Sequence, residues 1–258
     1  MIALVGIGLI GGFLSGLFGV GGGFIIIPLL MAFFAFDIKK ASATSLAAIA
    51  VTAVAGTVSY AASGGVLWLP AVALSVGSIT GSYVGARLLK VVSARVILWI
   101  FVALVLVLAV RMMFSIDSGG IDTNTGLDWG NYLEMAGIGV FAGLLAGLLG
   151  VGGGIIVVPL LVIFFGFSSF EAKGTSLVML IPASLVGGWV NLRNGFVDVK
   201  VGLSIGVIAG AVSFTGVIVA KAMPETVNNI LFAILMLGIA AQFAVRAIRL
   251  TKPHRPIY

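Results

Sequence analysis

The residues of this sequence best suited to bind an anion are two glycine clusters and two Thr-Ser pairs. The stretch GLFGVGGGFIIIPLL occupies residues 16–30 and GLLGVGGGIIVVPLL occupies residues 147–161, with eleven of fifteen positions identical at a separation of 131. Three consecutive glycines disfavour a continuous helix, because each glycine costs about 1 kcal/mol relative to alanine in a helix interior. We therefore predict a helix break at each cluster.

A helix that starts directly after each break would present its N-terminal N–H groups to that break. These groups carry a partial positive charge that favours anions. Inside a membrane, such a break is tolerated only where protein or a water-filled cavity satisfies the free backbone groups. The clusters thus predict a neutral, donor-rich anion site near the middle of a membrane, although close helix packing alone is the alternative. Its predicted backbone donors are Gly21, Gly22, Gly23, Gly152, Gly153 and Gly154.

Hydroxyl side chains recur at the same separation and add further donors. Thr44 and Ser45 in ASATSL align with Thr175 and Ser176 in AKGTSL. Ser and Thr hydroxyls can donate to an oxyanion, and they also cap helix N-termini. Because two adjacent hydroxyls recur in both copies, we include all four in the predicted site.

The stretch WVNLRNGFVD, residues 189–198, differs between the copies. Asn191 and Arg193 stand where the first copy has Tyr60 and Ala62. We include Asn191 among the predicted anion-binding residues. Arg193 either attracts an anion at the mouth of a cavity or extends its charge to the membrane interface.

Membrane-spanning helices must position these residues. The 258 residues are 61% hydrophobic and 9% charged, whereas soluble domains carry about 25% charged residues. Too few polar side chains are present to coat a water-facing surface, so the chain is predicted to be an all-α polytopic membrane protein. We read its first apolar stretch as part of the fold rather than as a cleaved signal peptide, because no basic region precedes it.

Four apolar segments occupy each half of the chain. They are residues 2–36, 42–62, 68–89 and 96–114, then 132–167, 173–192, 199–222 and 227–248. The first segment of each half would form a straight helix of about 50 Å, too long for a hydrocarbon core of ~30 Å. We expect each to be a hairpin broken at its glycines. The predicted division is two homologous transmembrane repeats, a polar linker and a basic tail: 1–114, 115–131, 132–250 and 251–258.

The distribution of basic residues favours inverted repeats. If the first segments cross the membrane once each, Lys and Arg divide seven against seven. If they are hairpins, eleven lie on one side and three on the other, which the positive-inside rule favours. Both termini are then cytoplasmic and the linker is outside. The eleven are Lys39, Lys40, Arg87, Lys90, Arg95, Arg193, Lys200, Arg246, Arg249, Lys252 and Arg255, and the three are Arg111, Lys173 and Lys221.

The residue inventory argues against an enzyme and predicts no cofactor and no metal. There is no cysteine, the single histidine is His254 in the tail, and no Asp or Glu falls in the middle of a predicted span. Asp37, Glu171 and Asp198 come nearest and are interpreted as solvated loop charges. We attribute the net charge of +6 to residues flanking the spans, and expect no nucleic-acid partner.

The duplicated Gly-Gly-Gly-x4-Pro and Thr-Ser-Leu motifs, with NLRNGFVD, resemble the TauE/SafE sulfite exporter family of membrane permeases over nearly the whole chain. The resemblance implies a carrier in the inner membrane of a bacterium or archaeon for small sulfur-containing anions such as sulfite or an organosulfonate. Alternating access would come from rocking of one repeat against the other. An anion channel of the same fold and a non-transporting membrane scaffold are the alternatives, and the sequence leaves the coupling ion and the oligomeric state open.

Overall fold

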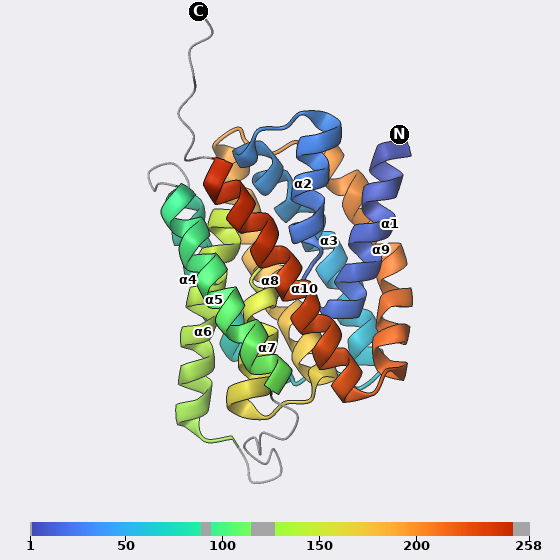
Figure 1. Cartoon of the computed structure of the whole chain (residues 1–258), viewed down its shortest axis with the longest axis vertical. Helices are drawn as coiled ribbons and strands as arrows, with labels where there is room; N and C mark the ends of the chain where they lie inside the picture. Colours follow the sequence, from blue (N-terminus) through green and yellow to red (C-terminus); the bar gives the residue numbers. More distant parts are fainter. Residues whose placement is uncertain (1, 89–93, 115–126, 250–258) are drawn as a thin grey trace, which may run out of the picture.

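The computed structural model describes residues 2–88, 94–114 and 127–249, and the regular structure of these ranges is entirely helical. Ten helices are present in them (Figure 1). They are α1 (Ile2–Phe18), α2 (Gly23–Phe34), α3 (Ile38–Ala62), α4 (Trp68–Leu88), α5 (Ala94–Phe114), α6 (Trp129–Leu149), α7 (Gly154–Phe165), α8 (Ser169–Arg193), α9 (Val199–Ala222) and α10 (Glu225–Arg249).

Six of the helices in the described ranges are long and apolar enough to cross a membrane: α3, α4, α6, α8, α9 and α10. Helices α1, α2 and α7 are shorter apolar helices, as is the Leu98–Met113 stretch of α5. Large apolar side chains remain exposed around the bundle, such as Leu69 and Ile218, as a lipid-facing surface requires. The prediction of an all-helical, multi-pass membrane protein is confirmed.

The helix breaks predicted at the glycine clusters are present. Helix α1 ends at Phe18 and α2 begins at Gly23, while α6 ends at Leu149 and α7 begins at Gly154. Gly21 has φ +77°, a left-handed conformation that side chains with a Cβ adopt only with strain. The chain can therefore leave one helix and start the next within four residues.

Helices α1 and α2 form a hairpin. A Cβ on Gly11 would lie 3.1 Å from Ile26 Cγ1, while a Cβ on Gly22 would lie 3.4 Å from Ser15 Cβ. A residue later in α1 therefore contacts a residue earlier in α2, so the two helices are antiparallel. Figure 1 shows α2 returning toward the end of the bundle at which α1 begins.

Two helix starts lie four residues before the predicted ones, because polar caps precede the apolar runs. The Asp37 carboxylate accepts a hydrogen bond from Lys40 N at 3.3 Å, so α3 starts at Ile38. The Ser168 hydroxyl accepts one from Glu171 N at 3.2 Å, so α8 starts at Ser169. These caps satisfy N–H groups that would otherwise lack partners.

Capping also shifts the start of α6 and gives three acidic residues a structural role. Asp128 caps α6 with its side chain, so this helix begins at Trp129, inside the segment predicted as linker; residues 115–126 and the predicted tail lie outside the described residues. Asp37, Glu171 and Asp198, interpreted as solvated loop charges, each accept a hydrogen bond from a backbone N–H at a helix start.

The helices fall into two directional groups. Gly12 packs on Ala209 and Gly16 on Ser213, so α1 and α9 are parallel, and glycines of α9 place it parallel to α3 in the same way. Helices α4, α6 and α8 form the second parallel group. The groups run in opposite directions, because Gly56 of α3 packs on Leu177 of α8 whereas Gly188 packs on Leu46.

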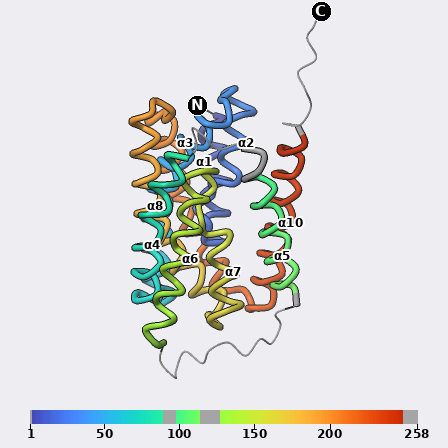
Figure 2. The backbone as a smooth tube through the Cα atoms, turned by 90° about the vertical axis from the view of Figure 1, so that its left-hand side faces the viewer, coloured from blue at the N-terminus to red at the C-terminus, as the bar shows by residue number. Residues whose placement is uncertain are grey.

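The remaining long helices pair with each other. Helices α5 and α10 lie side by side at one side of the bundle (Figure 2). The Phe101 and Phe243 ring centroids are 5.1 Å apart in this pair. The start of α1 and the end of α10 lie at one end of the molecule, and the end of α5 and the start of α6 lie at the other (Figure 1).

Candidate functional site

The two glycine breaks lie against each other in the buried centre of the bundle. A Cβ on Gly23 would lie 2.7 Å from the Gly150 carbonyl oxygen, and a Cβ on Gly154 would lie 2.8 Å from the Gly19 carbonyl oxygen. All six glycines predicted as site residues are buried. The structure therefore brings the two predicted backbone donor sets together, and only glycine fits where the two backbones meet.

Each break presents a run of unpaired backbone donors. Within the described part of the chain, the N–H groups of residues 20–24 and 151–155 have no hydrogen-bond acceptor, and all ten residues are buried. The first paired N–H groups after the breaks are those of Ile25 and Ile156. Buried N–H groups in folded proteins nearly always have a partner, which can be ordered water. These runs are therefore a place where a ligand or water would complete the hydrogen bonding.

The serine hydroxyls predicted as anion donors hold the breaks together. Ser45 Oγ donates to the Gly150 carbonyl oxygen at 2.5 Å, and Ser176 Oγ donates to the Gly19 carbonyl oxygen at 2.6 Å. Both serines are completely buried. Each serine thus reaches across to the opposite break, and binding an anion would require it to release a backbone carbonyl.

The threonine hydroxyls accept hydrogen bonds from neighbouring backbone. Thr44 Oγ1 accepts from Asp198 N at 3.0 Å, and Thr175 Oγ1 accepts from Leu67 N at 3.1 Å. Capping of their own helices, the alternative interpretation, is wrong because Asp37 and Ser168 occupy the capping positions. A role of the Thr-Ser pairs in anion binding stays a prediction.

Asn191 is completely buried, and neither its Nδ2 nor its Oδ1 has a partner among the described residues. One turn earlier on the same face of α8, a Cβ on Gly187 would lie 2.6 Å from Ser82 Oγ of α4 and 3.7 Å from Gly147 Cα of α6. Asn191 therefore lies on a face of α8 that is packed against other helices. An unpaired buried amide costs about 1–3 kcal/mol, so this side chain marks a second place where a polar ligand or water would fit.

Ser15 is a polar residue at the first break that the sequence interpretation missed. Its side chain is 1% exposed, and its hydroxyl has no partner within the described ranges. Its Cβ lies near Gly22, across the α1–α2 hairpin. The available signal was a lone hydroxyl on an otherwise apolar helix just before a glycine cluster.

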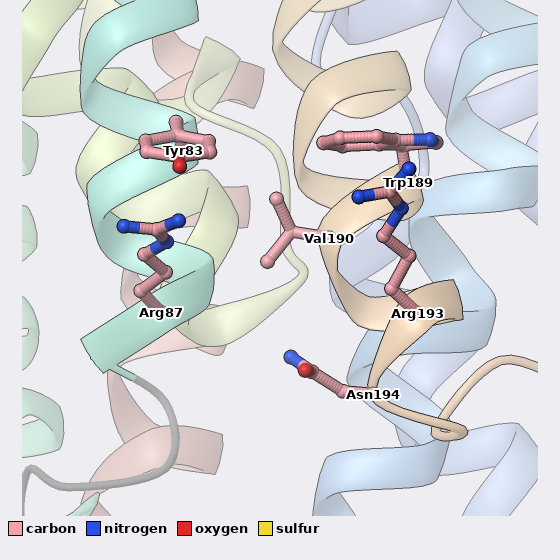
Figure 3. A pocket seen from close by; sticks show the side chains of 6 residues that line it. All are labelled: Tyr83, Arg87, Trp189, Val190, Arg193 and Asn194. Carbon is pink, nitrogen blue, oxygen red and sulfur yellow. The ribbon is translucent and has the colours of Figure 1, made fainter.

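A pocket of about 250 Å³ lies between the C-terminal ends of α4 and α8, and we call it the arginine pocket (Figure 3). Its lining consists of Tyr83, Arg87, Trp189, Val190, Arg193 and Asn194. Arg193 therefore lies at a cavity, one of the two places expected for it. Arg87 and Tyr83 were missed, because only the packing of α4 on α8 brings them to this position.

Lys173 is the other charged residue with an unexpected environment. It is completely buried, and its Nζ donates to Asn228 Oδ1 at 2.7 Å. Its Nζ also lies 5.8 Å from the Phe18 ring centroid. No carboxylate of the described residues pairs with it. Lys173 had been counted only as a basic residue on the less basic side.

Sequence comparison places the chain in a known protein family. The profile described as "Sulfite exporter TauE/SafE" matches residues 1–112 and 135–257. The chain belongs to the TauE/SafE family. The breaks, the Thr-Ser pairs and the arginine pocket are therefore features of a membrane transporter of the TauE/SafE family.

Curated relatives agree with the TauE/SafE assignment. A "Probable membrane transporter protein" of Haemophilus influenzae is 31% identical over 205 residues, covering 72% of this chain and 74% of that protein. "Probable membrane transporter protein YdhB" of Bacillus subtilis is 27% identical over 223 residues, covering 84% and 89%. No solved structure matches the chain with significant similarity.

Proposed function

We propose that this TauE/SafE protein carries a small anion, sulfite or an organosulfonate or another sulfur oxyanion, by alternating access around its two glycine breaks. One observation carries the proposal. Two runs of buried N–H groups without acceptors, residues 20–24 and 151–155, lie at adjoining helix N-termini.

The chemistry of these groups suits a compact oxyanion. Helix N-termini offer several convergent N–H donors and a partial positive charge. The carbonyl oxygens of Gly19 and Gly150 are held by serine hydroxyls, so they are partly neutralised beside the donors. Backbone N–H donors carry only partial charges, so they can bind an anion and also release it, which repeated transport requires.

We infer that α1–α5 and α6–α10 are inverted repeats. Helix bounds support this, because α2 and α3 coincide with α7 and α8 at both ends after a shift of 131 residues. Helix directions and the reciprocal bonds of Ser45 and Ser176 support it as well. Rocking of one repeat against the other would open the breaks to alternate sides by exchanging these two bonds.

The positive-inside rule orients the bundle with both termini in the cytoplasm. The start of α1 and the end of α10 lie at one end (Figure 1). The lysine-bearing starts of α3 and α9 and the arginine-bearing ends of α4, α8 and α10 lie at this end too. Tags inserted at position 120 and at the C-terminus are expected to report opposite sides. Tags on one side would contradict the orientation.

Sulfite flux into proteoliposomes tests the function. Saturable uptake is expected, with competition by thiosulfate and sulfoacetate but not by acetate. Sulfite loaded on the far side should accelerate uptake, because a carrier returns faster when occupied. Flux that neither saturates nor exchanges would identify a channel, and no flux of any of these anions would contradict the proposal.

The glycine breaks have a matched control. Gly21→Ala is expected to abolish flux, because φ is +77° and a Cβ would lie 2.9 Å from Ile49 Cγ2. Gly137→Ala in α6 is expected to keep flux, because nothing lies within 4 Å of a Cβ there. Equal flux in the two variants, both folded by circular dichroism, would remove the breaks from the mechanism.

A further inference from the structure

We propose that the arginine pocket is a second oxyanion site, present at one end of the molecule and separate from the glycine breaks. Its ligand is a group with a single sulfur or phosphorus centre bearing several oxygens. Such a group belongs to a free sulfite, sulfonate or phosphate ion or to the headgroup of an anionic lipid. The transport consequence rests on the proposed function, but the binding itself does not.

Two hydrogen bonds between α4 and α8 set the register that forms the pocket. Ser78 Oγ donates to Met179 O at 3.3 Å, and one turn further Ser82 Oγ donates to Ala183 O at 2.5 Å. The helices therefore run parallel in a fixed register. About one turn beyond the second bond, Tyr83 and Trp189 lie at the same level on the two helices, and the Arg87 and Arg193 side chains lie below them with Val190 in between (Figure 3).

Each guanidinium is stacked on an aromatic ring of its own helix. Arg87 Cζ lies 4.2 Å from the Tyr83 ring centroid, and Arg193 Cζ lies 4.0 Å from the Trp189 ring centroid. Both are pairs four residues apart, which face the same side of a helix. Stacking holds the planar group in one orientation and leaves its N–H edge free.

Neither guanidinium has a hydrogen bond or a carboxylate partner within the ranges that the structure describes. Each carries five N–H donors in a fork that matches the oxygens of sulfonate, sulfite or phosphate. The carboxamide of Asn194 also lines the pocket, below the two guanidinium groups in the view of Figure 3. A volume of about 250 Å³ holds one such group together with some of its water.

The residues that line the pocket are not repeated at the corresponding positions of the other half. The positions 131 residues away from its aromatic and cationic residues are Val58, Ala62, Phe214 and Ile218. None of these can bind an anion. An oxyanion would therefore be concentrated at one face of the transporter only, and affinity for transported anions should differ between the two faces.

Helix dipoles offer a competing explanation for the two charges. Both arginines lie at helix C-terminal ends, where any cation is stabilising. Lysine would satisfy the dipoles equally well but cannot form the planar fork. The variant Arg87→Lys/Arg193→Lys therefore separates the two explanations.

Binding is measured with Trp189 as the reporter. The full-length chain with Trp68→Phe, Trp99→Phe and Trp129→Phe keeps one tryptophan, and it is placed in phosphatidylcholine nanodiscs. Sulfite and inorganic phosphate are titrated while fluorescence is recorded, with acetate as the control anion. A second preparation contains phosphatidylglycerol and no added anion.

Saturable quenching by sulfite or phosphate is expected, weakened at least about tenfold by Arg87→Gln/Arg193→Gln, because each charge-assisted pair contributes roughly a factor of ten. The double lysine variant should be weakened as well, whereas Lys221→Gln on α9 should not. If only phosphatidylglycerol changes the fluorescence, and only with both arginines present, the ligand is a lipid headgroup. An unchanged response of the double glutamine variant to both sources would overturn the site.

Flux separates this site from the proposed function. In oriented proteoliposomes, the double glutamine variant should raise KM from the pocket face and leave KM from the other face unchanged. Arginine-dependent binding without any flux would remove the proposed function and keep the site. Flux with equal KM values at both faces, and no arginine-dependent binding, would keep the proposed function and remove the second oxyanion site.

Discussion

Tyr60 and Asn191 occupy positions 131 residues apart on α3 and α8, and both are completely buried. The Tyr60 hydroxyl donates to the Gly16 carbonyl oxygen at 2.7 Å, and its ring centroid lies 4.7 Å from that of Phe170. Asn191 has no partner for either polar atom among the described residues. The same position thus holds a bulky side chain with a hydrogen-bond partner in the first half and a polar side chain without one in the second.

The contrast extends along both helices. Helix α8 carries Lys173 near its start and Arg193 at its end, where α3 has Ser42 and Ala62. The hydroxyls of Ser45 and Ser176, by contrast, make equivalent bonds. The contacts between the two breaks are therefore the same in both halves, whereas the polar groups around them differ. The difference between the halves lies in α8 rather than in the breaks.

The largest effect on stability is expected where α8 packs on α10. Asn228→Leu removes the acceptor of the buried Lys173 ammonium, and leaving a buried charge unpaired costs about 3–5 kcal/mol of unfolding free energy. Unfolding in an SDS titration measures it. Lys173→Met/Asn228→Leu should recover most of the loss, because both polar groups are then replaced by apolar ones. A single variant as stable as wild type would show that the ammonium needs no partner.

A somewhat smaller effect on stability is expected when Tyr60 of the first half is replaced by asparagine, the residue at the corresponding position of the second half. Tyr60→Asn removes a buried ring and its hydrogen bond, and it should lower the unfolding free energy by about 3 kcal/mol. The control Tyr60→Phe keeps the ring and should cost about 1 kcal/mol. Equal midpoints for the two variants would mean that the ring does not close this position.

The smallest effect on stability is expected at Asn191. Asn191→Leu removes two unpaired buried atoms and should raise the unfolding free energy by about 1 kcal/mol. Sulfite flux should nevertheless fall, because a polar contact for the anion is lost. Leu192→Asn on the exposed face of α8 is the control and should leave flux unchanged. Full flux in Asn191→Leu would exclude the residue from the transport path.

Some features of the site were predictable from local chemistry. Glycine runs interrupt helices because of backbone entropy and because φ values such as +84° at Gly152 suit no other residue well, so both breaks could be placed from sequence. The predicted starts of α3 and α8 were wrong because Asp37 and Ser168 cap these helices before the apolar pattern begins. Hydrophobicity detects buried faces, whereas capping depends on single polar residues.

The sequence by itself determined an all-helical membrane protein, the position of its breaks and the family to which it belongs, because composition, helix propensity and motif spacing act along the chain. Only the tertiary structure decided that Ser176 bonds to Gly19, 157 residues away, and that Arg87 and Arg193 share one pocket. Such partners depend on helix direction and register, which arise from packing between distant segments. The tertiary structure also decided the environment of the unpaired N–H groups at the breaks, because a donor without a partner is costly only when the fold has buried it away from water.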